Sequence, residues 1–496
     1  MRTSASVISW TAAVLTSALG AAILYSAEPG INWPIWIATA ATSLVLSRII
    51  GIGRVERPLL VLAGWAILLS LGFAVTDKDF FQVLIVLSDA MLLGLATITL
   101  GAQTWTELSA KLLVAVPFLA PFRVLTATAS EAADAPRASS SPRSRAIIKG
   151  ALLSVPIIVV LVALLGTADP VIRWTTDQLG DWLPSISPRL LFFAFLLLLT
   201  LGANAIARRQ VAAKFPAYPP LRAAPTVGLT EQRMMLLSAA AVLWIFVALQ
   251  VSYFIHPPPA AIGSGVTFAD YARRGFGELS FAATLVGAII IVLEYARPAG
   301  ATDRDRTVLR RIELTLVIAL ELVLISAFRR VVLYEQAYGF TTARLFAQAY
   351  MIVMALALAA LALEITRGRI SIAFGRRVAE LALGVFTVLV FWNFEAWIVN
   401  KNIDRAATTG KFDASYTRRL SLDAVPTLVR RLPEIPQPQR DTVSLRLACR
   451  RMPAERHWFE WNRSVGAAAQ ALKEWEHASC ARVASRSIGV AAPERP

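Results

Sequence analysis

The sequence has few charged residues and few of the residue types that catalysis uses most often. Charged residues make up 17% of the 496 positions, whereas a typical soluble protein has about 25%. The three histidines stand at no spacing that metal ligands require. No P-loop, GxGxxG, HExxH or GxSxG motif occurs. The sequence therefore predicts no cofactor and no metal site, and it leaves an enzymatic activity open but unsupported.

Apolar residues, by contrast, are abundant and grouped. Hydrophobic residues make up 56% of the chain and the mean hydropathy is +0.59. They form segments of about twenty residues, the length needed to cross a membrane, and amphipathic periodicity within them is weak. The sequence thus predicts an all-α fold, a polytopic transmembrane helix bundle with about eleven spans. These spans lie near residues 7–27, 31–50, 58–76, 80–101, 147–168, 189–207, 234–255, 276–296, 312–333, 343–366 and 378–399.

Two N-terminal segments can each be interpreted as a membrane span or as something else. Residues 105–125 contain Lys111, Pro117 and Pro121 and lack a clean apolar length, so we interpret them as an interfacial or re-entrant segment rather than a span. Met1–Ala22 has features of a signal peptide. Because the next apolar segment follows almost at once, we favour an uncleaved first helix.

The distribution of lysine and arginine between the apolar segments predicts the orientation. With the N-terminus inside, the inner loops carry roughly three times as many of these residues as the outer loops. The net charge of +16 belongs to this loop pattern rather than to a nucleic-acid-binding surface. We therefore predict a multi-pass plasma-membrane protein with a cytoplasmic N-terminus and an extracytoplasmic C-terminus, and no nucleic-acid partner.

The same features divide the chain into four parts. Residues 126–146 are rich in Ala, Ser, Pro and Arg, which predicts a flexible cytoplasmic linker. It separates an N-terminal bundle at 1–125, with four spans and the doubtful segment, from a seven-span bundle at 147–399. Residues 400–496, which we call the C-terminal tail, contain short helical stretches interrupted by prolines and predict a small helical extracytoplasmic domain.

Two features of the C-terminal tail each allow two interpretations. Trp458, Phe459 and Trp461 suit contact with the membrane interface, but they suit the core of a small domain equally well. The only cysteines, Cys449 and Cys480, form a disulfide in an oxidising compartment or are separate thiols.

Four stretches of the sequence resemble one known family. They are FADYARRGFGEL at 268–279, YEQAYGFTTARLF at 334–346, NKNIDRAATTGKFDASYTRRLSLDAVPTL at 400–428 and HWFEWNRS at 457–464. Together they resemble a bacterial family of multi-pass membrane proteins known only as a domain of unknown function, family 4173, which is close to family 4153. The resemblance covers roughly residues 140–465, without the N-terminal third. It implies an architecture but no established activity.

By the predicted topology, all four stretches lie at or beyond the outer membrane face, where several arginines stand at helix ends. Arg273 and Arg274 begin the eighth span, Arg329 and Arg330 end the ninth, and Arg344 begins the tenth. A helix N-terminus disfavours a cation, so three of these arginines need compensation by negative charge. We call the group the rim arginines.

Two kinds of compensation fit this pattern. In the first, acidic side chains pair with the rim arginines and dock the C-terminal tail; the acids available are Glu278, Glu335, Glu395, Asp404 and Asp413. In the second, the arginines bind an anionic small molecule or a lipid head group. The candidate ligand-binding residues are then Arg273, Arg274, Glu278, Arg329, Arg330, Tyr334, Arg344, Glu395 and Asp404.

One acid lies near the middle of the ninth span. An intramembrane acid is costly and usually faces the bundle interior. Glu321 either relays a proton or cation towards Arg329, or forms a helix–helix hydrogen bond. The amides available for that bond are Asn204, Gln250 and Gln348.

Three functions therefore stay open for this predicted bilayer protein. The first is sensing or transport of an anionic solute or lipid head group at the outer rim. The second is a structural or assembly role in which the C-terminal tail recruits a protein partner. The third is a membrane-embedded transferase acting on a lipid-linked substrate.

Overall fold

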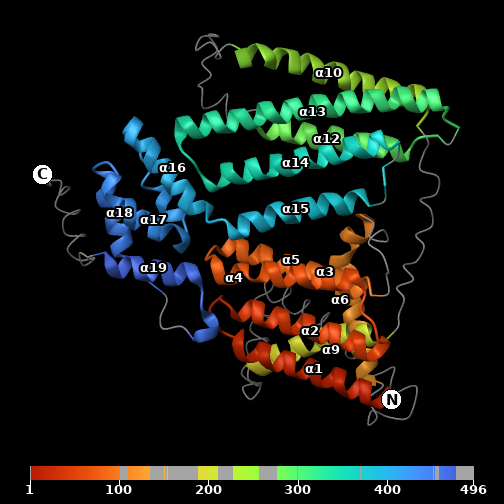
Figure 1. Ribbon diagram of the computed structural model, residues 1–496, viewed down its shortest axis with the longest axis vertical. Helices are drawn as coiled ribbons and strands as arrows, with labels where there is room; N and C mark the ends of the chain where they lie inside the picture. Colours follow the sequence, from red (N-terminus) through yellow and green to blue (C-terminus); the bar gives the residue numbers. More distant parts are fainter. Residues whose placement is uncertain are drawn as a thin grey trace, which may run out of the picture. The chain divides into compact units, whose positions relative to one another are not determined.

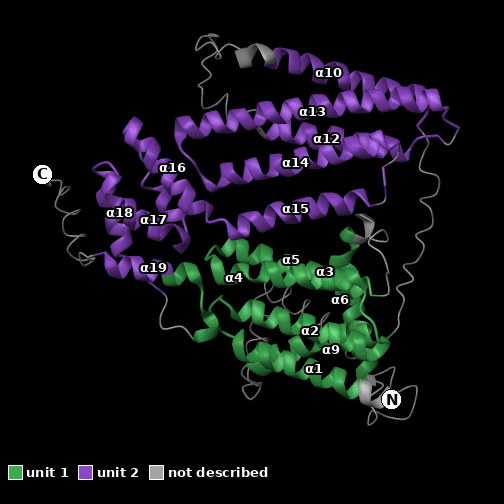
Figure 2. Ribbon diagram, in the orientation of Figure 1, with its two compact units in different colours: residues 1–214, 453–466 green, residues 215–452, 467–496 purple. Residues whose placement is uncertain are grey.

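The computed structural model describes residues 2–100, 110–133, 150, 154, 188–209, 227–255, 276–298, 300–368, 370–371, 373–450, 452 and 457–475. Within these ranges every regular element is a helix, which confirms the predicted all-α class (Figure 1). The chain forms two compact units (Figure 2). Unit 1 comprises residues 1–214 with 453–466, and unit 2 comprises residues 215–452 with 467–496.

Unit 1 is built from the N-terminal helices and a short piece of the C-terminal tail. Its helices are α1 (Arg2–Ile23), α2 (Asn32–Ile52), α3 (Arg57–Ser70), α4 (Gly72–Val75), α5 (Asp79–Ile98), α6 (Ala110–Ala133), α9 (Pro188–Arg208) and the 3-10 turn η5 (Trp458–Glu460). Helix α9 packs against α1, α2 and α6, and so lies at the centre of the unit.

Unit 2 is organised around one long helix, α13 (Asp303–Tyr338), which packs against α10, α12 and α14. Its transmembrane-type helices are α10 (Leu229–Ile255), α12 (Phe276–Tyr295), α14 (Thr342–Thr366) and α15 (Phe374–Phe391). The tail adds α16 (Phe394–Thr409), η2 (Tyr416–Arg419), η3 (Leu422–Ala424), α17 (Val425–Arg431), η4 (Leu432–Glu434) and α18 (Gln439–Ala448). The last helix in the described part of the chain is α19 (Arg463–Glu474).

Length and composition support a multi-span membrane protein. Nine helices in the described ranges are long and apolar enough to cross a membrane, and the bent pair α15 and α16 makes ten. Most coincide with a predicted span to within a few residues. The predicted span 312–333 lies inside α13, which is not one of these nine helices because it carries more charge than they do. The predicted span 147–168 lies outside the described residues, apart from 150 and 154.

The last predicted span, 378–399, is wrong at its C-terminal end. Helix α15 stops at Phe391, and α16 begins at Phe394 after a bend of 66°. The side chain of Asn393 caps α16, accepting a hydrogen bond from the Ala396 N–H at 3.0 Å. The bend takes α16 away from the direction of α15 and makes it part of the tail.

Helix α6 contains residues 110–125 of the doubtful segment, whose first five residues lie outside the described ranges, and it crosses its neighbours. Val116 and Ala120 lie against Gly94 near the end of α5. Further along α6, the Thr128 hydroxyl donates to the Leu198 carbonyl of α9 at 2.7 Å. The helix thus passes from the end of α5 to the second half of α9, across these helices rather than alongside them (Figure 1). Its composition would allow it to span a membrane, but this course favours the predicted interfacial segment.

The predicted linker at 126–146 begins too early, because α6 continues to Ala133. The hydroxyl of Ser130 donates to the carbonyl of Thr126 within the helix. Glu131 pairs with Arg208 and, at 2.8 Å, with Arg209. Residues 134–146 lie outside the described ranges.

The division between bundles also differs from the predicted one, because α9 belongs to unit 1. Asn204 of α9 donates to the Ser43 hydroxyl of α2 at 2.7 Å. The hydroxyls of Thr200 and Ser17 lie 2.9 Å apart, which joins α9 to α1. Polar groups in a membrane must find partners inside the protein, so these bonds fix α9 among the N-terminal helices.

A buried ion pair closes one end of unit 1. Arg48 of α2 is 2% exposed and Glu56, just before α3, is 8% exposed. The Arg48 Nε donates to Glu56 Oε2 at 2.9 Å, and its Nη1 donates to the Ala207 carbonyl of α9 at 3.2 Å. Burial alone would raise the pKa of Glu56, but hydrogen bonds from Arg48 and the backbone hold that pKa below its ordinary value.

Replacing Glu56 with Gln should strongly destabilise unit 1, because Arg48 would keep its buried charge without a counter-charge. We expect a loss of about 3–5 kcal/mol in the free energy of unfolding, measured by denaturation of the purified protein in detergent. The matched control is Glu474→Gln at the exposed end of α19, which should change stability by less than about 0.5 kcal/mol. Similar losses for the two variants would contradict the role given to the pair.

Candidate functional site

The loop between α13 and α14 fastens the tail to unit 2. Gly339 has a φ of +89°, and a Cβ atom there would lie 2.8 Å from the Asn402 Oδ1, so only glycine suits this position. The Asn402 side chain accepts a hydrogen bond from the Phe340 N–H at 2.7 Å and donates one to the Phe340 carbonyl at 2.9 Å. One amide side chain of α16 therefore satisfies both backbone groups of a loop residue.

Two further tail residues satisfy the helix ends beside this loop. The Tyr416 hydroxyl accepts from the Thr342 N–H at 2.7 Å, at the N-terminus of α14. The Arg405 Nε donates to the Gln336 carbonyl at 2.8 Å, and another of its nitrogens bonds to the Ala337 carbonyl. A helix C-terminus favours a cation and leaves carbonyls without intrahelical partners. The tail therefore caps both α13 and α14.

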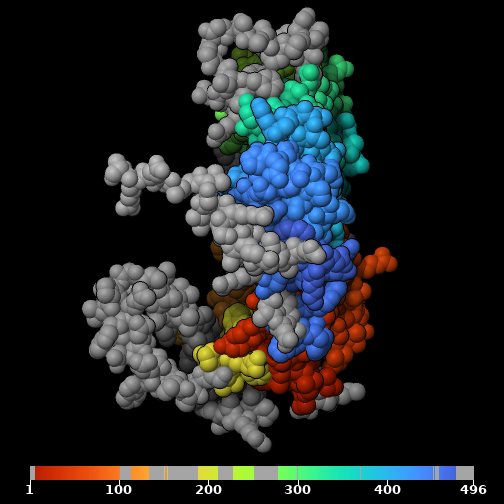
Figure 3. Space-filling view, turned by 90° about the vertical axis from the view of Figure 1, so that its left-hand side faces the viewer, coloured from red at the N-terminus to blue at the C-terminus, as the bar shows by residue number. Residues whose placement is uncertain are grey.

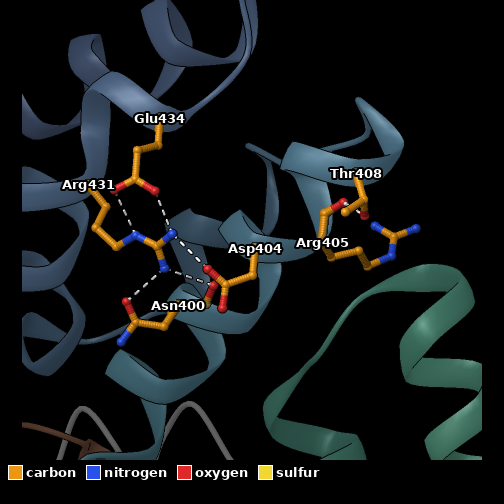
Figure 4. A network of polar contacts seen from close by, with 6 residues as sticks. All are labelled: Asn400, Asp404, Arg405, Thr408, Arg431 and Glu434. Carbon is orange, nitrogen blue, oxygen red and sulfur yellow. Dashed lines mark hydrogen bonds and ion pairs between the residues drawn. The ribbon is translucent and has the colours of Figure 1, made fainter.

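Arg431 joins α16 to α17 (Figure 4). Its Nη2 lies 2.7 Å from Asp404 Oδ1 and 2.5 Å from Glu434 Oε2, and its Nη1 donates to the Asn400 carbonyl at 3.1 Å. The hydrogen bond from Arg431 lowers the pKa of the Glu434 carboxyl. This network holds the tail helices in one arrangement.

A buried acid fixes the next part of the tail. Glu395 is 5% exposed and accepts from the Ser421 N–H at 2.8 Å and from its hydroxyl at 2.6 Å. Asn393 donates to the Asp423 carbonyl at 2.9 Å. Around these bonds lies an apolar core that includes Phe394, Ile398, Ile403, Val425 and Leu428, each 2% exposed or less. Figure 3 shows the tail residues as a closely packed blue surface.

Several predicted site residues lie outside this network. Arg273 and Arg274 lie outside the described residues. Glu278, near the start of α12, and Arg329 on α13 are both exposed. Arg330 points to another helix, because its Nη2 donates to the Gln250 Oε1 of α10 at 2.8 Å.

Arg344 lies at the N-terminus of α14, where the helix dipole disfavours it. Its guanidinium carbon lies 4.1 Å from the centre of the Tyr334 ring, and one nitrogen bonds to the Gly339 carbonyl. The aromatic face and the carbonyl both offer partial negative charge. Compensation of this arginine is therefore internal: it comes from these neutral groups and from the nearby charge of Glu335, one of the acids that the sequence indicated.

Three of the acids named for internal pairing bond to side chains other than the rim arginines. Asp404 pairs with Arg431, an arginine that the sequence did not single out. Glu335 accepts from Gln348 at 2.8 Å. Asp413 accepts from the Ser415 hydroxyl at 2.5 Å. Asn402, Arg405 and Tyr416 are not among the candidate ligand-binding residues, although all three lie in the family-like stretch 400–428.

Glu321 is half-buried on α13 and makes no hydrogen bond or ion pair with any residue that the structure describes. The three amides considered as its partners have other contacts. Gln250 accepts from Ser326 and Arg330, Gln348 donates to Glu335, and Asn204 donates to Ser43. The hydrogen-bond interpretation is therefore wrong for these amides, and the relay stays a prediction.

The stretch HWFEWNRS belongs to unit 1, where it caps other helix ends. Asn462 donates to the carbonyls of Phe73 and Thr76 at 2.8 and 3.0 Å. The Ser464 hydroxyl donates to the Val75 carbonyl at 2.8 Å. Glu460 accepts from the backbone N–H of Glu28 at 3.0 Å. The end of α4 and the α1–α2 loop thus gain partners from a segment that is 386 to 432 residues away in the chain.

The two tryptophans of this stretch are exposed, whereas Phe459 between them is half-buried. Trp458 is 71% exposed and Trp461 is 53% exposed, so the core interpretation is wrong for both tryptophans. Contact with the membrane interface stays a prediction. Cys449 is exposed at the end of α18, and Cys480 lies outside the described residues, so the disulfide also stays a prediction.

Replacing Asn402 with Ala should loosen the tail, because the Phe340 N–H and carbonyl would both lose their partner. We expect a loss of about 2 kcal/mol in local stability, at about 1 kcal/mol for each hydrogen bond. Hydrogen exchange of residues 336–345 and 400–428 measures it. Thr408→Ala on the exposed face of α16 is the matched control, since its hydroxyl bonds only to the Arg405 carbonyl of its own helix. Unchanged exchange in Asn402→Ala would contradict the role of this amide.

Acid should weaken the Arg431 network. A carboxylate whose pKa is lowered in the folded state stabilises the protein above its unfolded pKa, and this contribution is lost as the pH falls through the folded pKa. The pKa of Glu434 is lowered by Arg431. The stability difference between the native protein and Arg431→Gln should therefore be largest above about pH 5 and shrink below about pH 4. Thermal unfolding across this range tests it, and a constant difference would contradict it.

One protein-family model matches the chain. This family model, described as "Domain of unknown function (DUF4153)", matches residues 63–431, from α3 to the end of α17. No curated protein and no solved structure matches the chain.

The match refines the resemblance found in the four stretches. It supports the 4153 type of family. It also begins well before residue 140, so the expectation that the N-terminal third stands outside the family is wrong. The matched region covers most of the chain and includes the loop at Gly339 and the capping residues of α16. The chain therefore belongs to the DUF4153 family of domains of unknown function.

Proposed function

We propose that this integral membrane protein is an assembly scaffold whose C-terminal tail recruits an acidic protein partner outside the cytoplasm. The observation that carries the proposal is the reciprocal pairing of Asn402 with the Phe340 backbone. This pairing and the bonds of Arg405 and Tyr416 hold the tail in a fixed position at the ends of α13 and α14. A fixed surface binds a partner without the entropy cost of ordering a mobile one.

The exposed surface of the tail determines the chemistry of the partner. Its exposed cations include Lys401, Lys411, Arg418, Arg419 and Arg430. Two nearby exposed acids, Asp404 and Glu434, are bonded to Arg431. The remaining surface charge is mainly positive, and such a surface attracts and orients an acidic partner.

The charge distribution in each unit supports an extracytoplasmic tail. In unit 1, Arg48 and Arg208 lie at the helix ends opposite those that Asn462 caps. In unit 2, arginines gather around the start of α13, and the tail caps the end of that helix. They include Arg297, Arg304, Arg306, Arg310, Arg367 and Arg377. Arginine-rich ends are typical of the cytoplasmic side, which supports a cytoplasmic N-terminus and placement in a bacterial plasma membrane.

Ligand binding at the rim arginines is the second candidate function. Arg344 favours it, because its guanidinium is already oriented by Tyr334 and the Gly339 carbonyl, and an oriented guanidinium suits a carboxylate or phosphate. The scaffold function ranks first because the tail bonds to the backbone of the same loop.

Reversing the charge of two tail residues tests the scaffold. A membrane-impermeant, amine-reactive cross-linker on intact cells should capture the partner through exposed Lys411 in the native protein. Arg418→Glu with Arg419→Glu should reduce that capture by about tenfold or more, because close interfacial charge pairs contribute over about 1.5 kcal/mol.

The control is Arg304→Glu with Arg311→Glu, which reverses two exposed arginines of α13 away from the tail and should leave capture unchanged. Equal capture by the tail variant and the native protein would contradict recruitment through this surface. Labelling of Lys411 only after cell lysis would contradict the extracytoplasmic location.

A further inference from the structure

Unit 1 contains a cavity of about 260 Å³ between the ends of α5, α6 and α9. Its polar lining includes Arg123, Ser130 and Arg209, and its apolar lining includes Ile98 and Ile206. The cavity lies at the arginine-rich end of unit 1, so it is separate from the helix ends that Asn462 caps.

The cavity has more positive than negative charge. Arg123 is half-buried and makes no ion pair with any described residue. Glu131 is shared between Arg208 and Arg209, so one carboxylate serves two guanidinium groups. Arginine presents a rigid set of donors that fits a phosphate group. The charge of this cavity therefore suits an anion.

The surface beside the cavity is apolar. Val114, Phe118 and Phe122 are 74%, 78% and 64% exposed. They are four residues apart and form one stripe along α6. The stripe ends next to Arg123. A ligand that has both an anionic group and long apolar chains would contact both features, whereas a soluble phosphate would contact only the first.

We propose that this cavity binds the phosphate of an anionic phospholipid, and that the acyl chains of the same lipid cover the stripe on α6. Arg123 and Arg209 hold the head group, and the Ile98 and Ile206 side chains contact its glycerol. The interfacial course of α6 follows from the same contacts, because the helix then lies between head groups and hydrocarbon. This site does not depend on the tail or on recruitment of a partner.

Native mass spectrometry of the full-length, delipidated protein in detergent tests the proposal. Phosphatidylglycerol should bind more tightly than phosphatidylcholine, which has no net charge. Arg123→Gln should weaken phosphatidylglycerol binding by about tenfold or more, the typical effect of losing a hydrogen bond to a charged group. Phosphatidylcholine carries the same phosphate, so its weaker binding should also fall. The control is Arg57→Gln, which replaces the exposed first residue of α3. It should leave the binding of both lipids unchanged.

A second variant distinguishes binding inside the cavity from a general attraction between the lipid and positive charge. Ala127 lines the cavity, and Ala127→Leu should fill part of it and weaken phosphatidylglycerol binding without a change in charge. Size-exclusion chromatography establishes that each variant is folded. Equal binding by native protein, Arg123→Gln and Ala127→Leu would overturn the site. Binding of glycerol 3-phosphate as tight as that of phosphatidylglycerol would overturn the lipid assignment.

Discussion

The structure depends on the backbone groups at helix ends, which have no partner within their own helix. In both units these groups are satisfied by the C-terminal tail. Asn402 pairs with Phe340, Arg405 binds the last carbonyls of α13, and Asn462 binds the carbonyls beside α4. An unpaired polar group away from water costs free energy comparable to a lost hydrogen bond. The tail is therefore an integral part of the two helical units, and its interactions explain why its sequence contains so many short polar side chains.

Much of the membrane architecture could be predicted from the sequence, because span length and hydropathy follow directly from bilayer thickness. The interfacial interpretation of residues 105–125 stays a prediction, because α6 crosses its neighbours but is also long and apolar enough to span a membrane. The errors lie where a local pattern is overruled by distant contacts. The apolar segment at 378–399 continues past Phe391 in composition, but Asn393 caps a new helix there. Similarly, α9 resembles any other span, and only the partners of Thr200 and Asn204 assign it to unit 1.

The candidate site was predicted in part. The arginines at helix ends correctly indicated a need for compensation, since the dipole argument applies to any helix. The nature of that compensation could be predicted only in part, because the Tyr334 ring and the Gly339 carbonyl join Glu335 around Arg344, and Gln250 bonds to Arg330. Likewise, Arg431 became the partner of Asp404 through the packing of α17 on α16, and no sequence spacing encodes that contact.

The two capping segments of the tail come after α4 and α13 in the chain, so the ribosome makes them later than the helix ends that they cap. A nascent chain that already contains α4 and α13 must wait for Asn402 and Asn462 before the carbonyls at those helix ends are satisfied. During this interval the helices can insert, but the exposed ends distinguish an unfinished chain from a complete one. Proteases or chaperones that recognise unpaired backbone would thus have a physical basis for quality control, and the tail would serve as a final check on assembly.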